Sequence, residues 1–527
     1  MARKYVIIMS ILFTLGFESC TDWLDVKPPS EIVLDDYWQS EVQAQAVLSA
    51  CYRGLTTDAN VERMIVWGEL RSDNLTSGIG FPSGRADMQK ILDVNITPSN
   101  AYCSWASMYA VINNCNTFLH YAPGVVNADP NFTIGKLHTM ESEVLAIRAL
   151  CYFYLVRTYK EVPYIDTPSI DDTQNYDVPK SSEREVLDHI IADLISAQKY
   201  ARVDYGSTVY NKGRITLSAI NSILADVYLW DQQYANCIEM CNRVIADPNL
   251  QLVPTELTYI NLFYRGNSSE SIFELQFDEN VQSNNPVRYL YGWGASLQSV
   301  QGELSYPVFL EKGSDYSPFK YKKGTTLEGE KDIRYDDYIV QNMGNLTGIY
   351  SIFKYAGIQR TENSQEQSTY SWRTTTPNWI VYRLADVILM KAEALAELPS
   401  ATEDNFKEAL DMVNLTYTRS NPKSSALDYS DYSTQGDLEK LILRERQREL
   451  LFEGKRWFDL MRLARRYNSP SALLAYVGPK LTGDILQYSR MSVMNALYLP
   501  VPKSDIDNNS NLVQNPFYDE NNTTPLK

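Results

Sequence analysis

The stretch that decides the fold is residues 441–466, which read Leu-Ile-Leu-Arg-Glu-Arg-Gln-Arg-Glu-Leu-Leu-Phe-Glu-Gly-Lys-Arg-Trp-Phe-Asp-Leu-Met-Arg-Leu-Ala-Arg-Arg. Apolar residues at 441–442 and 450–452, with strong helix formers between them, predict a helix that packs one face on a core. Gly454 favours a left-handed turn that ends this helix, and Trp457 begins a second apolar face. The stretch therefore predicts a helical hairpin.

Charged residues lie beside the large apolar residues in both helices of this hairpin. They are Arg444, Glu445, Arg446, Arg448, Glu449, Arg456, Asp459 and Arg462. Arginine forks match carboxylates bidentately, so ion pairs among them would fix how the two helices cross. An acid/base site is the alternative, but arginine is a poor proton donor or acceptor at neutral pH and the segment has no histidine. We expect the cluster to be structural.

This hairpin resembles the Glu-Arg…Glu-Leu…Glu-Gly-x-Arg-Trp-Phe-Asp-Leu-x-Arg signature of the SusD/RagB family, nutrient-binding lipoproteins of the Bacteroidetes outer membrane. Further stretches resemble the same family in the expected order: Glu141 to Tyr164, Ser269 to Phe277, Tyr382 to Glu393, and Leu499 to Tyr518. The resemblance implies a mainly α fold, a helical superhelix of tetratricopeptide-like helix pairs with a loop-rich subregion that holds a few short strands. It also implies a SusC-like TonB-dependent transporter as partner.

Two helix pairs in the sequence look like copies of each other. Leu224-Ala225-Asp226-Val227 precedes a turn and the helix of Ala235 to Ile245, and Leu384-Ala385-Asp386-Val387 precedes a turn and the helix of Phe406 to Tyr417. Antiparallel helix pairs in a repeat of about 34 residues, with alanine where helices cross closely, are typical of tetratricopeptide-like packing.

Domain organisation follows from the absence of a low-complexity linker inside residues 31–500. We expect a single body over 31–527, with helical repeats at about 37–250 and 376–466, an insertion at about 250–375 and a C-terminal segment at 467–527. The insertion is rich in Gly, Asn, Ser and aromatic residues and is too long for a mere connection. We therefore expect it to face the ligand.

The N-terminus has the pattern of an export signal. Arg3 and Lys4 precede an apolar run from Tyr5 to Phe17, which has the length of a signal-peptide core and is too short to span a bilayer. We expect residues 1–19 to be removed on export.

Ser19-Cys20 resembles a lipobox, although Phe17 and Glu18 depart from its usual pattern. We expect Cys20 to become the lipidated N-terminus and residues 20–30 to tether the body to the outer membrane, facing the cell surface. Simple secretion with cleavage nearby is the alternative.

The amino-acid composition limits the classes of partner that the protein can bind. The net charge of −17 argues against nucleic acid, because the phosphate backbone requires a basic face. Tyrosine is abundant at 37 residues, and its flat face and hydroxyl suit surfaces that bind polar ligands, although helix packing also uses tyrosine.

Cys237 and Cys241 lie one helical turn apart without a histidine or second cysteine pair nearby, so we expect no metal site and no cofactor.

Three groups of residues are candidates for ligand binding. Tyr289, Tyr291 and Trp293 alternate along the chain, so on an extended segment their rings would form one row that stacks on sugar faces. The rival hypothesis is a strand that buries those rings.

Tyr370 and Trp372 form a second aromatic group in a polar stretch, expected to be a loop. Asp73 and Asn74, next to the Gly-rich loop Ser77 to Gly84, are a third candidate. Capping and turn formation are the alternative explanation for such an Asp-Asn pair.

The sequence favours a surface lipoprotein that binds an extracellular oligosaccharide or glycan and has no catalytic residues. A peptide-binding member of the same family is an alternative, and a glycoside hydrolase that uses two carboxylates is a more distant one. A protein-binding scaffold is a further possibility, as with many helical repeats.

Overall fold

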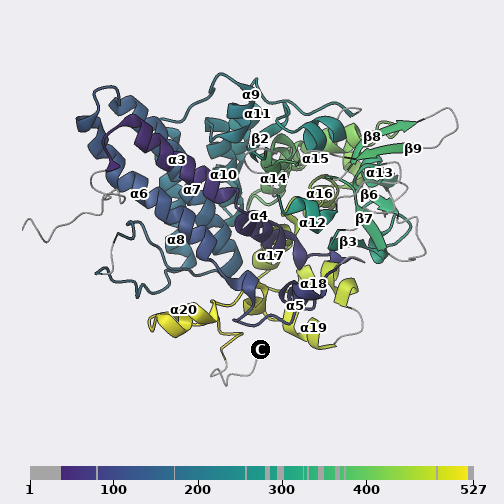
Figure 1. Cartoon of the computed structure of the whole chain (residues 1–527). Helices are drawn as coiled ribbons and strands as arrows, with labels where there is room; N and C mark the ends of the chain where they lie inside the picture. Colours follow the sequence, from purple (N-terminus) through teal and green to yellow (C-terminus); the bar gives the residue numbers. More distant parts are fainter. Residues whose placement is uncertain are drawn as a thin grey trace, which may run out of the picture.

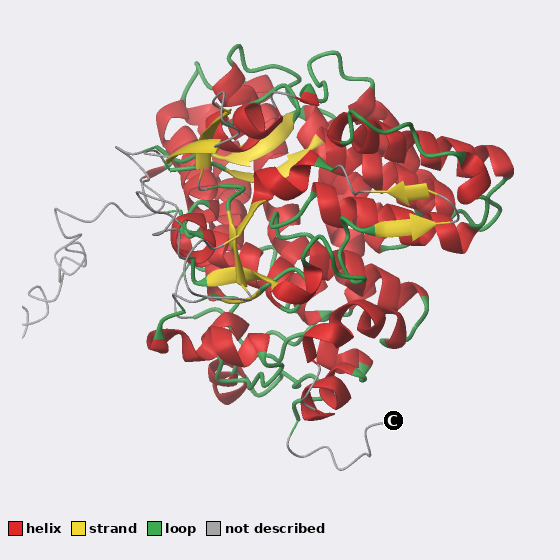
Figure 2. Ribbon diagram, turned by 90° about the vertical axis from the view of Figure 1, so that its right-hand side faces the viewer, coloured by secondary structure: helices red, strands yellow, loops and turns green. Residues whose placement is uncertain are grey.

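The computed structural model describes residues 37–78, 81–170, 173–255, 258–278, 285–292, 302–323, 326–328, 332–341, 349–355, 357–362, 368–372, 376–481 and 485–519. Helices dominate these residues and the strands are short (Figure 2). The predicted mainly α fold class with a few short strands is therefore confirmed. The signal peptide 1–19, Cys20 and the tether 20–30 lie outside the described residues.

The N-terminal half is a stack of helices that packs around α7 (Figure 1). Its helices are α3 (Glu41–Leu55), α4 (Asp58–Ile65), α5 (Ala86–Leu92), α6 (Ala106–Ala128), α7 (Ile134–Tyr159), α8 (Glu183–Gln198), α9 (Thr208–Gly213), α10 (Leu217–Trp230) and α11 (Tyr234–Ile245). Helix α7 contacts α3, α6 and α8, and every residue from Ala146 to Tyr159 is buried. This explains its apolar character on all sides.

The two copy-like helix pairs stack on each other. Helix α10 packs on α11, α14 (Leu384–Ala396) packs on α15 (Glu403–Ser420), and α11 packs on α14. The chain between the pairs leaves and returns through two antiparallel strands, β2 (Ser271–Leu275) and β10 (Trp379–Arg383). The tetratricopeptide-like packing predicted from sequence is therefore present, and the strand pair closes the base of the insertion.

The insertion holds most of the strands. Antiparallel strands β1 (Thr76–Ser77), β3 (Leu304–Pro307), β7 (Ile349–Ile352) and β6 (Ile339–Gln341) form one sheet in that order, β4 (Tyr321–Lys323) pairs with β5 (Thr326–Glu328), and β8 (Gly357–Glu362) pairs with β9 (Ser368–Trp372). Two short helices, α12 (Val287–Tyr291) and α13 (Ile333–Tyr338), lie among them.

The C-terminal segment returns to the N-terminal half. It contains α18 (Ser471–Val477), α19 (Ile485–Met491) and α20 (Lys503–Asn508), which lie beside early elements in Figure 1. The backbone N–H of Leu499 donates to Thr158 O at 2.8 Å, and that of Lys503 donates to Pro98 O at 2.9 Å. Most buried apolar side chains form one cluster from Trp38 to Leu512, and a smaller second cluster lies among α14, α15 and α16. The described cysteines are all buried, as is usual for small core thiols.

The predicted hairpin is confirmed as α16 (Gln435–Glu449) and α17 (Arg456–Arg466). Gly454 has a φ of +71°, the left-handed conformation that glycine adopts without strain. The loop also packs against Gly68 in the π-helical segment Val66–Leu70, where an added Cβ would lie 1.9 Å from Gly454 O. The two glycines therefore allow the hairpin loop to contact the N-terminal half directly.

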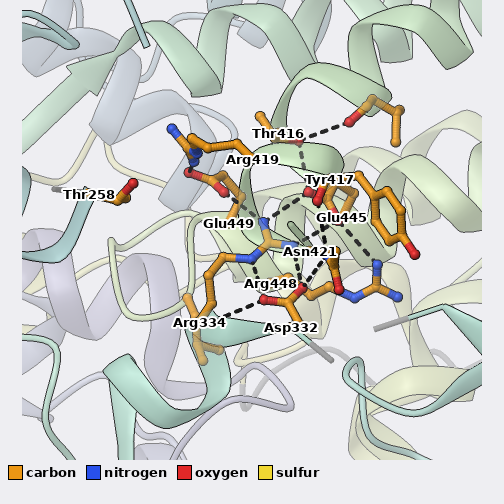
Figure 3. A network of polar contacts seen from close by, with 12 residues as sticks. Thr258, Asp332, Arg334, Thr416, Tyr417, Arg419, Asn421, Glu445, Arg448 and Glu449 are labelled. Atoms are coloured by element: carbon orange, nitrogen blue, oxygen red, sulfur yellow. Dashed lines mark hydrogen bonds and ion pairs between the residues drawn. The ribbon is translucent and has the colours of Figure 1, made fainter. Parts of the chain in front are cut away.

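Glu445, Arg448 and Glu449 of the hairpin belong to a buried network, shown in Figure 3. Arg334 from α13 pairs with Asp332 at 2.6 Å, Glu445 at 2.8 Å and Glu449 at 2.6 Å. Glu449 also accepts from Arg383 at 2.6 Å and from Arg419. The network joins the insertion, the repeats and the hairpin. All the predicted hairpin charges except Arg444 are buried, as expected of structural ion pairs.

Candidate functional site

The predicted row of three rings does not form. Residues 287–291 fold into the short helix α12, in which positions two apart point to nearly opposite sides. Tyr291 is fully buried and stacks on Tyr355 with centroids 5.8 Å apart, so its assignment as a ligand contact is wrong. Tyr289 remains partly buried at the edge of the core, and Trp293 lies outside the described residues.

Asp73 and Asn74 are core residues, so their assignment as ligand contacts is also wrong. Arg456 donates through Nε and Nη2 to Asp73 at 2.8 and 2.9 Å, and Gln447 Nε2 donates to Asn74 Oδ1 at 2.8 Å. Both Asp73 and Asn74 are buried. They anchor the segment after α4 to the hairpin, as bidentate Arg–carboxylate pairs do in cores.

Tyr370 and Trp372 belong to a strand, whereas the sequence predicted a loop. They lie in β9, where Tyr370 is in register with Arg360 and Trp372 with Gly357 of β8. Their part in ligand binding stays a prediction.

Tyr289 belongs to a cluster of polar side chains from distant segments, which we call the Arg85 cluster. Its members are Glu62, Arg85, Tyr102, Tyr289 and Glu303. The Arg85 guanidinium lies over the Tyr289 ring, 5.0 Å from its centroid. Arg85 pairs with Glu62 and with Glu303, each at 2.9 Å, and its side chain is 26% exposed. The cluster therefore presents charged and aromatic groups that solvent reaches.

Short irregular elements position these side chains. Arg85 ends a 3₁₀ turn just before α5, and Tyr102 lies in a second 3₁₀ turn before α6. The backbone N–H of Glu303 donates to Tyr289 O at 2.9 Å, which holds the start of β3 against α12. An added Cβ on Gly302 would lie 2.5 Å from the Tyr291 backbone, so this close approach requires glycine.

The cluster offers donors and acceptors side by side. Tyr102 donates its hydroxyl to Glu62 at 3.1 Å and accepts from Arg85 Nη1 at 3.3 Å. Burial lowers the pKa of Arg85, but the Glu62, Tyr102 and Glu303 partners outweigh it, so the pKa lies above its ordinary value. Burial raises the pKa of Tyr289 to about 12. The cluster thus combines a cation and two neutral phenols with the acceptor oxygens of Glu62 and Glu303.

A separate cavity of about 420 Å³ opens between α6, the loop at 163–178 and α20. Its polar groups already hold that loop in place. Tyr109 donates its hydroxyl to Pro163 O at 2.6 Å, Asn116 Nδ2 donates to Ile165 O at 2.9 Å, and Asn509 Nδ2 donates to Val178 O at 2.9 Å. We therefore place the candidate site at the Arg85 cluster.

The sequence pointed to Tyr289 alone among the members of this cluster. The others come from α4, two 3₁₀ turns and the start of β3, and no spacing pattern links them. One signal was available for Arg85, because it directly follows the Gly-rich loop that turn chemistry marked as a ligand-facing segment.

Two family models match successive parts of the chain. Residues 22–229 match a model described as "Starch-binding associating with outer membrane", and residues 281–518 match the SusD family model. A SusD-like protein of Formosa agariphila is 27% identical, over 87% of this chain and 91% of the relative. A second SusD-like protein of the same organism is 25% identical, over 97% of this chain and 99% of its own length.

Solved structures share the fold. A SusD superfamily protein from Bacteroides vulgatus has a TM-score of 0.71 at 18% identity and covers 91% of this chain and 100% of that protein. A SusD homolog from Bacteroides thetaiotaomicron has a TM-score of 0.70 at 19% identity and covers 92% of this chain and 100% of that protein. The expected helical superhelix with a loop-rich subregion is therefore confirmed as a known architecture.

Proposed function

Because the chain belongs to the SusD/RagB family of Bacteroidetes, we propose that it captures an extracellular oligosaccharide or glycan at the cell surface without transforming it. The description of the model that matches residues 22–229 supports both a glycan ligand and association with the outer membrane. The observation that carries the proposal is the Arg85 cluster, a partly exposed site where an aromatic ring, a guanidinium and carboxylates meet.

The chemistry of the cluster suits a sugar. Hydroxyl groups both donate and accept, so a ligand hydroxyl could accept from Arg85 and donate to Glu62 or Glu303. The Tyr289 ring adds a flat apolar surface beside them. Tyr370, Trp372 and Trp293 remain our proposed additional aromatic contacts.

We further propose how the protein is attached to the membrane and where it delivers its ligand. Cys20 would carry the lipid anchor, the body would stay in water, and the ligand would pass to a SusC-like TonB-dependent transporter. Across the ranges that the structure describes, no helix is long and apolar enough to cross a bilayer. Labelling cells with an alkynyl fatty acid tests the anchor, because Cys20→Ala should lose the label.

Affinity electrophoresis against a panel of soluble glycans and peptides tests the ligand class. We expect at least one glycan to retard the wild-type protein and Arg85→Met to migrate freely in the same gel. Arg243→Met is the matched control, because Arg243 forms an exposed pair with Glu239 on α11.

Retardation of the Arg85→Met and wild-type proteins to the same extent would place the ligand elsewhere. Retardation by peptides alone would replace the glycan with a peptide ligand, and release of shortened products from a glycan would indicate a hydrolase instead.

A further inference from the structure

A second polar cavity lies apart from the Arg85 cluster. It has a volume of about 340 Å³ and is enclosed by α9, the start of α10 and the segments at 247–250 and 268–272. In Figure 1, α9 is at the top of the view and α5, which follows Arg85, is near the bottom. We call it the Lys212 cavity, after the cation that lines it.

Lys212 is 7% exposed, and no acceptor lies within hydrogen-bond or ion-pair distance of its ammonium group among the residues that the structure describes. Burial of an ammonium group without an acceptor is costly. Burial lowers the pKa of Lys212, and the more distant carboxylates of Glu274 and Asp247 partly oppose this. Among the residues that the structure describes, the ammonium therefore has no direct partner.

The two carboxylates near Lys212 already have donors. Asp247 accepts from Ser218 Oγ at 2.5 Å, and from the backbone and side-chain nitrogens of Asn249 at 3.0 and 3.1 Å. Glu274 accepts from the Asn267 backbone N–H at 3.0 Å and from Asn378 Nδ2 at 2.9 Å. With these acceptors engaged, the Lys212 ammonium is an unused donor in the lining of the cavity, so a matching ligand would supply an acceptor for it.

The N-terminus of α10 also favours a ligand that supplies hydrogen-bond acceptors. Thr216 caps the helix, accepting from the Ala219 N–H at 3.2 Å, and both Thr216 and Ser218 line the cavity. Helix α10 has 14 residues, and the N-terminus of such a helix carries a partial positive charge that favours anions. Asp247 accepts from Ser218 in the first turn of α10 and so uses part of this partial charge, while Lys212 of α9 supplies a separate cation in the lining.

Val203 lines the cavity and is 56% exposed, and Val209 and Tyr210, which lie between the lining residues Thr208 and Asn211 on α9, are 54% and 59% exposed. A polar interior with an apolar edge matches a small ring that carries a charged group. We propose that the Lys212 cavity binds a small ligand the size of a single sugar through a carboxylate that pairs with Lys212.

Isothermal titration calorimetry with glucuronate and glucose tests this, because the two sugars differ in one carboxylate. We expect the wild-type protein to bind glucuronate at millimolar concentration and to bind glucose at least tenfold more weakly. Lys212→Met should weaken glucuronate binding at least tenfold. Lys199→Met, at the exposed end of α8, should bind glucuronate like the wild type.

Equal affinity of Lys212→Met and the wild type for glucuronate, equal affinity for both sugars, or no saturation by glucuronate would overturn the proposal. Lysine acetylation of the wild-type protein, followed by mass spectrometry, keeps the test valid if Lys212→Met does not fold. Glucuronate should protect Lys212 and leave Lys199 reactive, and the absence of this difference would also overturn it. Neither readout depends on glycan binding at the Arg85 cluster.

Discussion

The network around Arg334 and the Arg85 cluster are built from the same residue types and differ in burial. Arg334 is 2% exposed and pairs with three carboxylates, whereas the side chain of Arg85 is 26% exposed and pairs with two. Buried pairs leave an uncompensated charge when one partner is lost, while exposed pairs are weak. Burial, and not the presence of arginine and carboxylate, therefore separates a structural ion-pair network from a surface that a ligand can reach.

The largest effect is expected at Glu449, which accepts from Arg334, Arg383 and Arg419. Glu449→Ala would leave these buried guanidinium groups short of a partner, and we expect the free energy of unfolding to fall by about 3–5 kcal/mol. Urea unfolding measures it. Glu403→Ala is the control, because it breaks only an exposed pair with Lys407 and should change the midpoint little. Equal midpoints for the two variants would contradict the structural role.

The free energy of unfolding should depend on pH through Glu69, which lies beside the hairpin loop. Burial raises the pKa of Glu69 from 4.5 to about 8, so the folded protein holds this proton more tightly than the unfolded chain does. Its contribution is full below pH 4.5 and is lost as the pH rises towards 8. Across this window the wild type should lose roughly 2–4 kcal/mol more than Glu69→Gln. Parallel pH profiles from urea unfolding would show that Glu69 is charged in the fold.

Gly454→Ala tests the contact between the hairpin loop and the N-terminal half. The φ of +71° and the Met64 carbonyl oxygen, 3.0 Å from an added Cβ, should make the substitution cost about 1–3 kcal/mol. Gly436→Ala is the control, because nothing lies within 4 Å of its added Cβ in the first turn of α16. Calorimetric melting should show a lower midpoint for the first variant only, and equal midpoints would mean that the loop is free to move.

The smallest effect on stability is expected at Arg85. Its pairs are partly exposed, so Arg85→Met should change the free energy of unfolding by less than about 1 kcal/mol in urea. A fall in the free energy of unfolding as large as that of Glu449→Ala would mean that the Arg85 cluster is a structural network like the one around Arg334. It would contradict the difference between the two regions.

Local patterns predicted the hairpin because periodic apolar residues and Gly454 act within one short stretch. Local patterns gave the wrong structure at Tyr289 to Tyr291, where Asn285 Oδ1 accepts from the Val287 N–H at 3.1 Å and Pro286 precedes the first turn of α12. This Asn-Pro start was the signal for a helix in place of a strand.

The site residues that the sequence did not predict correctly depend on contacts between residues far apart in the chain. Asp73 is buried because Arg456, far along the chain, pairs with it, and no local pattern reports such a partner. The Arg85 cluster likewise combines α4, two 3₁₀ turns, α12 and the start of β3, so the fold itself is needed to find it.

Thermal unfolding of the wild-type and Arg85→Met proteins, with and without a glycan that retards the wild type, tests the central claim most directly. A ligand that binds the folded state raises the unfolding midpoint. We predict that both proteins melt together without glycan and that only the wild type is stabilised by it. An equal rise in both proteins would contradict the assignment of the ligand to the Arg85 cluster.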